Sequence, residues 1–222
     1  MNEYIHDKIK EIKKSLRLSI NGIVSAHQRR QGLNYKINFG VEIPRIREIA
    51  KRYTKDITLA QELWKDNIRE CKILAIYLYP ENLFDTETAE KWIAECPFTE
   101  IADHLCRTLL KNLPQAKEKA LSLITDSNEM SIYCGYSTLS NLFREGTSLN
   151  KEEESIYVNG IKKVLLSNKE VSHPIQNCAS ISLQKYSEQG KEQTARICKE
   201  VKSWNIENNE ALKLLIANIE EE

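Results

Sequence analysis

The sequence has little of the material from which tight turns are built. Its 222 residues include only 7 glycines and 5 prolines, so the many turns of an all-β protein have few places to form. No apolar run approaches the roughly 18 residues that a membrane-spanning helix needs. The opening stretch, MNEYIHDKIKEIKK, is charged rather than apolar, so no secretory signal is expected. These absences favour a helical, cytoplasmic protein without a membrane partner.

The patterns of metal and redox chemistry are also missing. The six cysteines form no CxxC or CxxxC pair, and none is spaced from a histidine as in a zinc site. We interpret them as reduced, buried small side chains. The four scattered histidines are expected to have structural or surface roles. Because phosphate-binding loops and the HExxH and GxSxG motifs are absent as well, the sequence predicts no metal and no organic cofactor.

The charges sum to zero but are unevenly spread. The 32 Lys and Arg balance the 32 Asp and Glu, which argues against a strongly basic nucleic-acid binder. Residues 1–55 nevertheless carry 13 Lys and Arg against 5 Asp and Glu. This excess indicates a negatively charged partner for the N-terminal part, and a solvated basic helix surface explains it equally well.

Apolar residues recur with the period of a helix almost everywhere. In the first helix, Ile5, Ile9, Ile12 and Leu16 are spaced by three or four residues. Pro44 marks the start of another, because the first helical turn tolerates its missing N–H. Further helices are expected over residues 18–30, 58–64, 67–79, 86–95, 99–112, 114–125, 128–144, 150–166, 170–188, 191–203 and 207–219. Their predicted N-terminal caps include Thr58, Asn67, Asp85, Thr99, Ser127 and Asn150.

About twelve helices joined by short loops predict stacked helix pairs. Two helices with two loops come near the 40-residue period of HEAT-like repeats. We therefore expect an all-α fold, a HEAT-like helical-repeat solenoid of about six antiparallel pairs. Residues 1–222 are expected to form a single domain. The concave face of such a solenoid usually binds an extended partner.

Three segments carry a recognisable pattern. Residues 35–50 contain an aromatic-rich loop, a Phe-Gly-Val turn at residues 39–41, and a Pro-x-x-Arg helix start at Pro44. Residues 59–79 hold a leucine–tryptophan pair followed by Glu70 and an apolar helix. The third segment, residues 91–106, contains Asp103, and a fainter match runs along 170–187. With these motifs the chain resembles the DNA alkylation repair family of HEAT-like DNA glycosylases.

The resemblance implies binding of duplex DNA in a basic concave cleft, and excision of purines alkylated at N3 or N7. Asp103 matches the catalytic aspartate of the family, which stabilises the oxocarbenium-like sugar or orients the attacking water. Helical spacing places Asp103 beside Thr99 and Arg107, where an ordinary exposed ion pair with Arg107 is the alternative. The candidate DNA contacts are Arg29, Arg30, Lys36, Arg45, Arg47, Lys51, Phe98, Thr99 and Arg107.

The chain departs from the family pattern at three positions. Thr99 and Ile181 stand where the family has tryptophans, and Cys134 stands where it has an arginine. Phe98 or Tyr133 could replace a stacking surface locally. The three tryptophans of this chain are flanked by helix-periodic apolar residues and are expected in the core. A second hypothesis is therefore a non-catalytic helical-repeat module that binds nucleic acid or a protein partner through its concave face.

Overall fold

A computed structural model describes residues 3–167, 171–204 and 210–220 of the chain. These residues form thirteen α-helices and two short 3-10 helices, and the β-structure among them is one isolated bridge between Ile37 and Ile68. The prediction of an all-α fold is therefore confirmed. The chain divides into two compact units, Met1–Leu113 and Pro114–Glu222, which are called the N-terminal and C-terminal units and are described separately. That they act as one domain stays a prediction.

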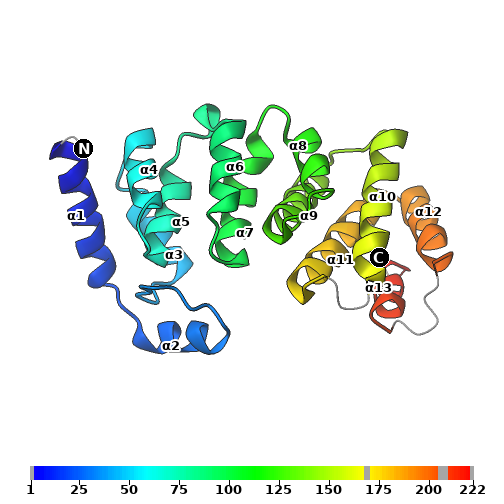
Figure 1. The fold of residues 1–222 in the computed structure, drawn as a ribbon, viewed down its shortest axis with the longest axis horizontal. Helices are drawn as coiled ribbons and strands as arrows, with labels where there is room; N and C mark the ends of the chain where they lie inside the picture. The colour runs from blue at the N-terminus through cyan, green and yellow to red at the C-terminus, as the bar shows by residue number, and fades with distance from the viewer. Residues whose placement is uncertain (1–2, 168–170, 205–209, 221–222) are drawn as a thin grey trace. The chain divides into compact units, whose positions relative to one another are not determined.

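The N-terminal unit is built from two layers of helices (Figure 1). In one layer α5 packs between α3 and α7. In the other, α4 and α6 meet through stacked indole rings of Trp64 and Trp92, and α1 contacts α3 and α4. The helices are α1 (Glu3–Arg17), α2 (Gly22–Arg30), α3 (Ile43–Ala50), α4 (Ile57–Trp64), α5 (Arg69–Leu78), η1 (Glu81–Leu83), α6 (Thr86–Ala94), α7 (Thr99–Thr108) and η2 (Leu110–Asn112).

The C-terminal unit repeats this pairing. Helix α9 packs against α8 and α11, and α11 in turn contacts α10, α12 and α13. Four aromatic rings from α9, α10 and α11 pack together in its core, those of Tyr136, Phe143, Tyr157 and Tyr186. The helices are α8 (Ala116–Leu123), α9 (Glu129–Arg144), α10 (Lys151–Leu166), α11 (His173–Ser187), α12 (Lys191–Lys202) and α13 (Glu210–Glu220).

The predicted core residues are buried. The apolar stripe of α1 is at most 8 % exposed. The rings of Trp64 and Trp92 stack with centroids 4.1 Å apart and planes 2° from parallel, and Trp204 is 3 % exposed. Large aromatic side chains contribute much of a core's apolar burial. The tryptophans of this chain are therefore core residues that stabilise the fold.

Two of the predicted helix caps are confirmed. The Thr88 N–H donates to Asp85 Oδ1 over 2.8 Å at the start of α6. At α10, Asn150 accepts backbone N–H bonds while the Glu153 side chain accepts the Asn150 N–H, which completes a capping box. Such reciprocal bonds satisfy N–H groups that the helix itself leaves without partners.

The other four predicted caps are wrong by one or two residues. A capping residue must have extended backbone, and Thr58 and Thr99 already lie within their helices. The residues that occupy the cap positions are Asp56 for α4, Ile68 for α5, Phe98 for α7 and Asn128 for α9. The helix expected over 18–30 begins only at Gly22, and that expected over 99–112 ends at Thr108. Residues 170 and 207–209 of two predicted helices lie outside the described residues.

Candidate nucleic-acid interface

Helix α7 presents Asp103 on its polar side, as predicted. Ile101 and Leu105 are fully buried, whereas Asp103 is half-buried and Arg107 is exposed. Residues three or four apart share one side of a helix, so Asp103 and Arg107 lie together at the surface. The carboxylate is thus accessible from solvent on the layer formed by α3, α5 and α7.

A row of polar side chains crosses this layer. The Tyr77 hydroxyl of α5 lies 2.9 Å from His104 Nδ1 of α7. Arg47 Nε of α3 donates to the Tyr77 hydroxyl over 3.4 Å, and the guanidinium lies 5.7 Å from the centre of the tyrosine ring. Arg47 is therefore oriented by Tyr77 of α5, which in turn bonds to His104 of α7.

The imidazole of His104 is neutral in this setting. It is 7 % exposed, and burial lowers its pKa to about 4, with the positive charge of Arg107 acting in the same direction. Arg47 also lowers this pKa, which means that Arg47, His104 and Arg107 lie within electrostatic reach of one another. His104 is thus a buried, neutral side chain that bonds to Tyr77 and lies near Arg47 and Arg107.

A groove of about 300 Å³ opens beside this row of side chains. Lys55 at its edge also bonds to Glu81 over 2.7 Å. Basic and aromatic side chains around one concavity suit an anion with a flat or sugar-like portion. The groove is lined by Arg47, Ala50, Lys51, Tyr53, Lys55, Tyr77 and Leu78. The sequence predicted two of its cations, Arg47 and Lys51. It predicted neither Lys55 nor Tyr53 of the same segment, nor Tyr77, which comes from α5.

The remaining predicted DNA contacts lie elsewhere in the N-terminal unit. Arg45 bonds to Glu48 over 2.8 Å and to Ser19 over 3.2 Å. The ring of Phe98 packs edge-on against Tyr35, with centroids 4.6 Å apart. Thr99 is half-buried at the start of α7. Three cations are exposed on α2 and the loop after it, namely Arg29, Arg30 and Lys36.

A buried network of charges lies behind the polar row. Arg69 is 2 % exposed and Glu70 is fully buried. The Arg69 guanidinium donates to Glu100 from Nε and Nη2, over 2.9 and 2.5 Å, and to Glu70 over 3.2 Å. Glu100 also accepts a 2.8 Å bond from the Tyr35 hydroxyl. Burial opposes the ionisation of Glu100, but the bonds and charge of Arg69 outweigh it, so the pKa of this carboxyl is lowered.

This network fixes the Phe-Gly-Val turn. Glu70 accepts the N–H groups of Phe39 and Val41, each over 3.2 Å, and Arg69 donates to the Val41 carbonyl over 3.0 Å. Gly40 has a φ of +69°, and a Cβ there would lie 2.1 Å from the Asn21 carbonyl oxygen. Only glycine meets both demands, which explains the sequence of the turn and the buried glutamate in α5.

The departures from the family pattern have different surroundings in the C-terminal unit. Cys134 is fully buried within α9, so a side chain at this position does not reach a ligand on the surface. Tyr133 is 9 % exposed and has little ring surface to offer. Ile181 on α11 is 38 % exposed. An aliphatic side chain therefore stands at the surface at the position where the resemblance predicts a tryptophan.

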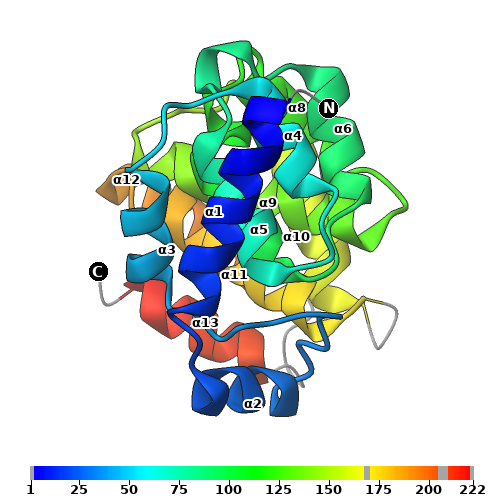
Figure 2. The ribbon, with the colours of Figure 1, turned by 90° about the vertical axis from the view of Figure 1, so that its left-hand side faces the viewer.

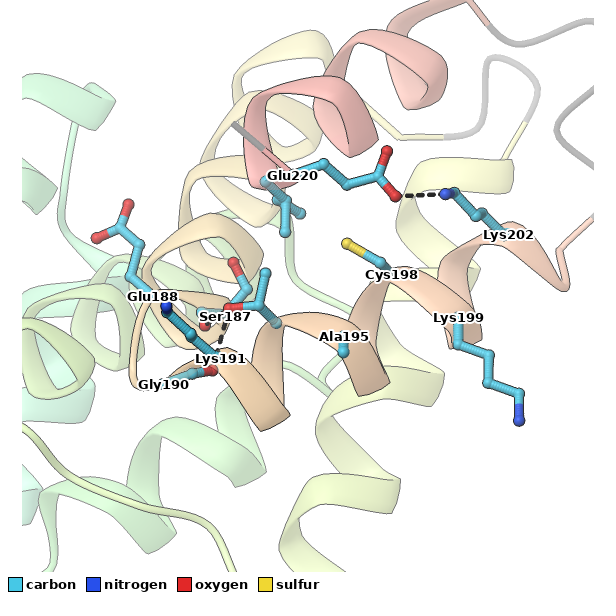
Figure 3. A pocket seen from close by; sticks show the side chains of 11 residues that line it. Ser187, Glu188, Gly190, Lys191, Ala195, Cys198, Lys199, Lys202 and Glu220 are labelled. Atoms are coloured by element: carbon cyan, nitrogen blue, oxygen red, sulfur yellow. Dashed lines mark hydrogen bonds and ion pairs between the residues drawn. The ribbon is translucent and has the colours of Figure 1, made fainter. Parts of the chain in front are cut away.

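A cavity of about 1020 Å³ lies in the C-terminal unit, lined by the end of α11 and by α12 and α13. Figure 3 shows the Cys198 thiol directed into it, beneath an ion pair between Lys202 and Glu220. Burial raises the pKa of Cys198, and the nearby Glu220 carboxylate adds to this. The thiol is therefore protonated near neutral pH, which suits neither nucleophilic attack nor metal binding. Within the described ranges no three His, Cys, Asp or Glu side chains gather as a metal site.

Consecutive helices paired in two layers are the architecture of a HEAT-like repeat protein. A family model described as "DNA alkylation repair enzyme" matches residues 12–154, more than half of the chain. The chain belongs to this family. The resemblance inferred from residues 35–50, 59–79 and 91–106 is thereby confirmed.

One solved structure supports the HEAT-like fold. It covers 87 % of this chain and 81 % of its own, with a TM-score of 0.73 and 17 % sequence identity. Its protein is described as one of "a new family of proteins related to the HEAT-like repeat DNA glycosylases with affinity for branched DNA structures". A designed armadillo repeat protein matches with a TM-score of 0.37 and 13 % identity, over 95 % of this chain and 98 % of its own.

No curated protein matches the chain. Among the described residues, none of the helices has both the length and the apolar character that crossing a membrane requires.

Proposed function

We propose that this chain is a DNA-binding member of its family, and that it holds the phosphate backbone of duplex DNA on the layer formed by α3, α5 and α7. The observation that carries the proposal is the groove beside Arg47, Lys51 and Tyr77. Arginine and lysine contacts to phosphates dominate the affinity of proteins for DNA. Family membership and the DNA affinity described for the similar structure point to the same class of ligand.

The geometry favours Arg47 as the main phosphate contact. Its Nε bonds to Tyr77, which leaves the two terminal nitrogens of the guanidinium for a ligand. A guanidinium donates two parallel bonds to a phosphate, and one that is already oriented loses less side-chain entropy on binding. Arg107 on α7 extends the positive surface next to Asp103.

Salt-dependent binding tests this proposal. Affinity for a labelled duplex should fall linearly with salt on a logarithmic scale, because bound cations release counterions. The double variant Arg47→Ala/Lys51→Ala should lower that slope by about two, at about 0.9 per lost phosphate contact. Lys162→Ala/Lys163→Ala removes the same charge from exposed positions of α10 and should leave the slope unchanged. If the chain does not bind DNA at low salt, the result would instead favour the hypothesis of a protein partner.

Excision of alkylated purines is the second candidate function. It is favoured by the position of Asp103, half-buried on the same layer and one turn from Arg107. The glycosidic bond to such a positively charged purine breaks readily, and a nearby carboxylate stabilises the oxocarbenium-like sugar. Neither Thr99 nor the buried Cys134 supplies the family's tryptophan or arginine, so this hypothesis requires a different sugar-binding surface.

Single-turnover release of 7-methylguanine and 3-methyladenine from methylated duplex DNA separates the two candidates. If Asp103 is catalytic, Asp103→Asn abolishes release and leaves DNA binding intact. Salt-sensitive binding without any release would establish the non-catalytic alternative. Release that survives in Asp103→Asn would contradict the role assigned to this carboxylate.

A further inference from the structure

Helix α2 buries none of its residues. Most helices in folded proteins are stabilised by an apolar stripe packed on a core. Here the apolar side chains face solvent instead: Ile23 is 81 % exposed, and Leu18 and Ile20, just before the helix, are 80 % and 57 % exposed. Figures 1 and 2 show α2 beyond the ends of α1, α3 and α5. The segment Arg17–Ile37, called the α2 prong, therefore projects from the N-terminal unit.

Polar bonds hold helix α2 in place, and near the end of the prong Tyr35 is buried against Phe98. The Asn21 N–H donates to the Phe39 carbonyl over 2.9 Å, and the Ser25 hydroxyl donates to the Asn38 carbonyl over 3.0 Å. The Asn38 side chain donates to Gln28 over 2.8 Å. The turn at residues 39–41 is in turn fixed to α5 by Glu70 and Arg69. Helix α2, which buries none of its own side chains, is thus connected to the most polar part of the core, and this connection keeps its exposed side chains in a defined position.

The charge of this region has one sign. From Ile12 to Val41 the sequence contains no Asp or Glu, while it contains six Lys and Arg. Three of these cations, Arg29, Arg30 and Lys36, are exposed on the prong. Helix α2 rises about 1.5 Å per residue, so the arginines at its end lie roughly 10 Å along the helix from Ile23. The prong therefore presents apolar side chains at one end of α2 and positive charge at the other.

We infer that the α2 prong contacts DNA where base pairs are open, as at a branch or a bulge. Apolar side chains gain nothing from an intact duplex, whose base faces are stacked, but they pack against base faces at an opened or kinked step. Arg29, Arg30 and Lys36 bind the flanking phosphates. The inference rests on the proposed DNA binding and adds to it a preference for DNA with opened base pairs.

An anionic membrane surface also attracts basic and apolar side chains, but the prong fits it poorly. Helices that lie in a membrane interface have a long apolar side running along the helix. Helix α2 has nine residues, and its most exposed apolar side chains gather at its first turn and the residues before it. Such a short apolar tip suits a gap in a stack of bases.

Binding to two DNAs of the same length tests the inference, one fully paired and one with a three-nucleotide bulge. The wild-type protein should bind the bulged DNA about tenfold more tightly, which corresponds to one favourable base contact. Leu18→Ser/Ile23→Ser should abolish this preference and change duplex affinity less than about twofold. Both side chains are exposed, so the variant should fold normally, which circular dichroism verifies. The matched control is Leu83→Ser, which alters an apolar side chain 52 % exposed in η1.

The possible outcomes separate this inference from the proposed function. Equal affinity of the wild-type protein for the two DNAs, or a preference that persists in Leu18→Ser/Ile23→Ser, would overturn the inference and leave duplex binding standing. If the wild-type protein binds neither DNA at low salt, both the inference and the proposed function are overturned. Sedimentation with phosphatidylserine vesicles that depends on Leu18 and Ile23, without any preference for bulged DNA, would replace the DNA contact with a lipid one.

Discussion

The two units of the chain bury different kinds of polar group. Among the described residues, the buried polar side chains of the N-terminal unit are Arg69, Glu70, Lys72 and His104. Those of the C-terminal unit are the hydroxyl residues Ser131, Ser137, Thr138, Ser140, Ser182 and Ser187. The total charge differs as well, since residues 1–113 carry 19 Lys and Arg against 16 Asp and Glu, whereas residues 114–222 carry 13 against 16.

This contrast indicates that the buried polar side chains have different structural roles in the two units. Small hydroxyl residues allow helices to approach closely and can bond to their own backbone, as Ser187 does to the Gln184 carbonyl. Buried charges are costly unless they are paired, so a fold retains them where they determine a conformation. In the N-terminal unit they fix the turn before α3, and through it the α2 prong. We therefore associate ligand binding with this unit.

The largest expected effect comes from breaking the buried network. Glu70→Ala leaves the Arg69 guanidinium with one carboxylate fewer and removes the acceptor of two backbone N–H groups, so it should lower the free energy of unfolding by about 3–5 kcal/mol. Tyr157→Phe removes the 2.9 Å bond to Ser182 in the C-terminal unit and should cost about 1 kcal/mol. Urea denaturation measures both. Equal losses would contradict the contrast between the units.

The second prediction concerns pH. The pKa of His104 is lowered to about 4 in the folded chain, against about 6.5 when unfolded. Above pH 6.5 the imidazole is neutral in both states, and its contribution to stability does not change. Between pH 6.5 and 4 only the unfolded chain binds the proton, so stability should fall by about 3 kcal/mol over that range. His104→Gln should flatten this part of the profile, and substitution of the exposed His173 should not.

The third prediction compares two glycines with positive φ. Gly40→Ala adds a Cβ that collides with the Asn21 carbonyl, and it should cost about 2–3 kcal/mol and release the α2 prong. At Gly32 the φ is +90° but the space is open, so Gly32→Ala should cost only about 1 kcal/mol of backbone strain. Hydrogen exchange of residues 22–30 reports on the prong. Increased exchange in both variants alike would argue against the Gly40 contact as its anchor.

The smallest effect is expected at the helix caps, where the units should not differ. Asp85→Ala at α6 and Asn150→Ala at α10 each remove a side-chain acceptor from a helix start. Each should cost about 1 kcal/mol in thermal unfolding. A much larger loss in one unit would mean that local helix formation, rather than buried charge, distinguishes the two.

The sequence predicted most of the fold because its signals are local. The spacing of Ile5, Ile9, Ile12 and Leu16 follows from one helix, and so does the cap at Asn150. Two caps were misplaced because Asp56 and Asn128 resemble their polar neighbours Thr58 and Ser127 before the backbone is known. At α5 and α7 the cap positions hold Ile68 and Phe98, which make no side-chain cap bond. The single-domain prediction depends on how the units associate, which helical periodicity does not encode.

The candidate site was only partly predictable. Arg47 and Asp103 were found from a family pattern, Lys51 from the positive charge of residues 1–55, and Arg107 from helical spacing, and each of these signals covers one segment of the sequence. Tyr77 and His104 become informative only when α3, α5 and α7 lie side by side. The contact between Gly40 and Asn21 likewise joins residues 19 positions apart, so the glycine was recognised as part of a motif without its physical reason.

The most direct test of DNA binding by the N-terminal unit is hydrogen exchange with and without saturating bulged DNA. We predict slower exchange in α2, the loop to α3, and the helices α3, α5 and α7. Helices α8 to α12 should show little change. Protection confined to the C-terminal unit would contradict the assignment, because the buried charges of the N-terminal unit would then stabilise a surface that the DNA does not contact.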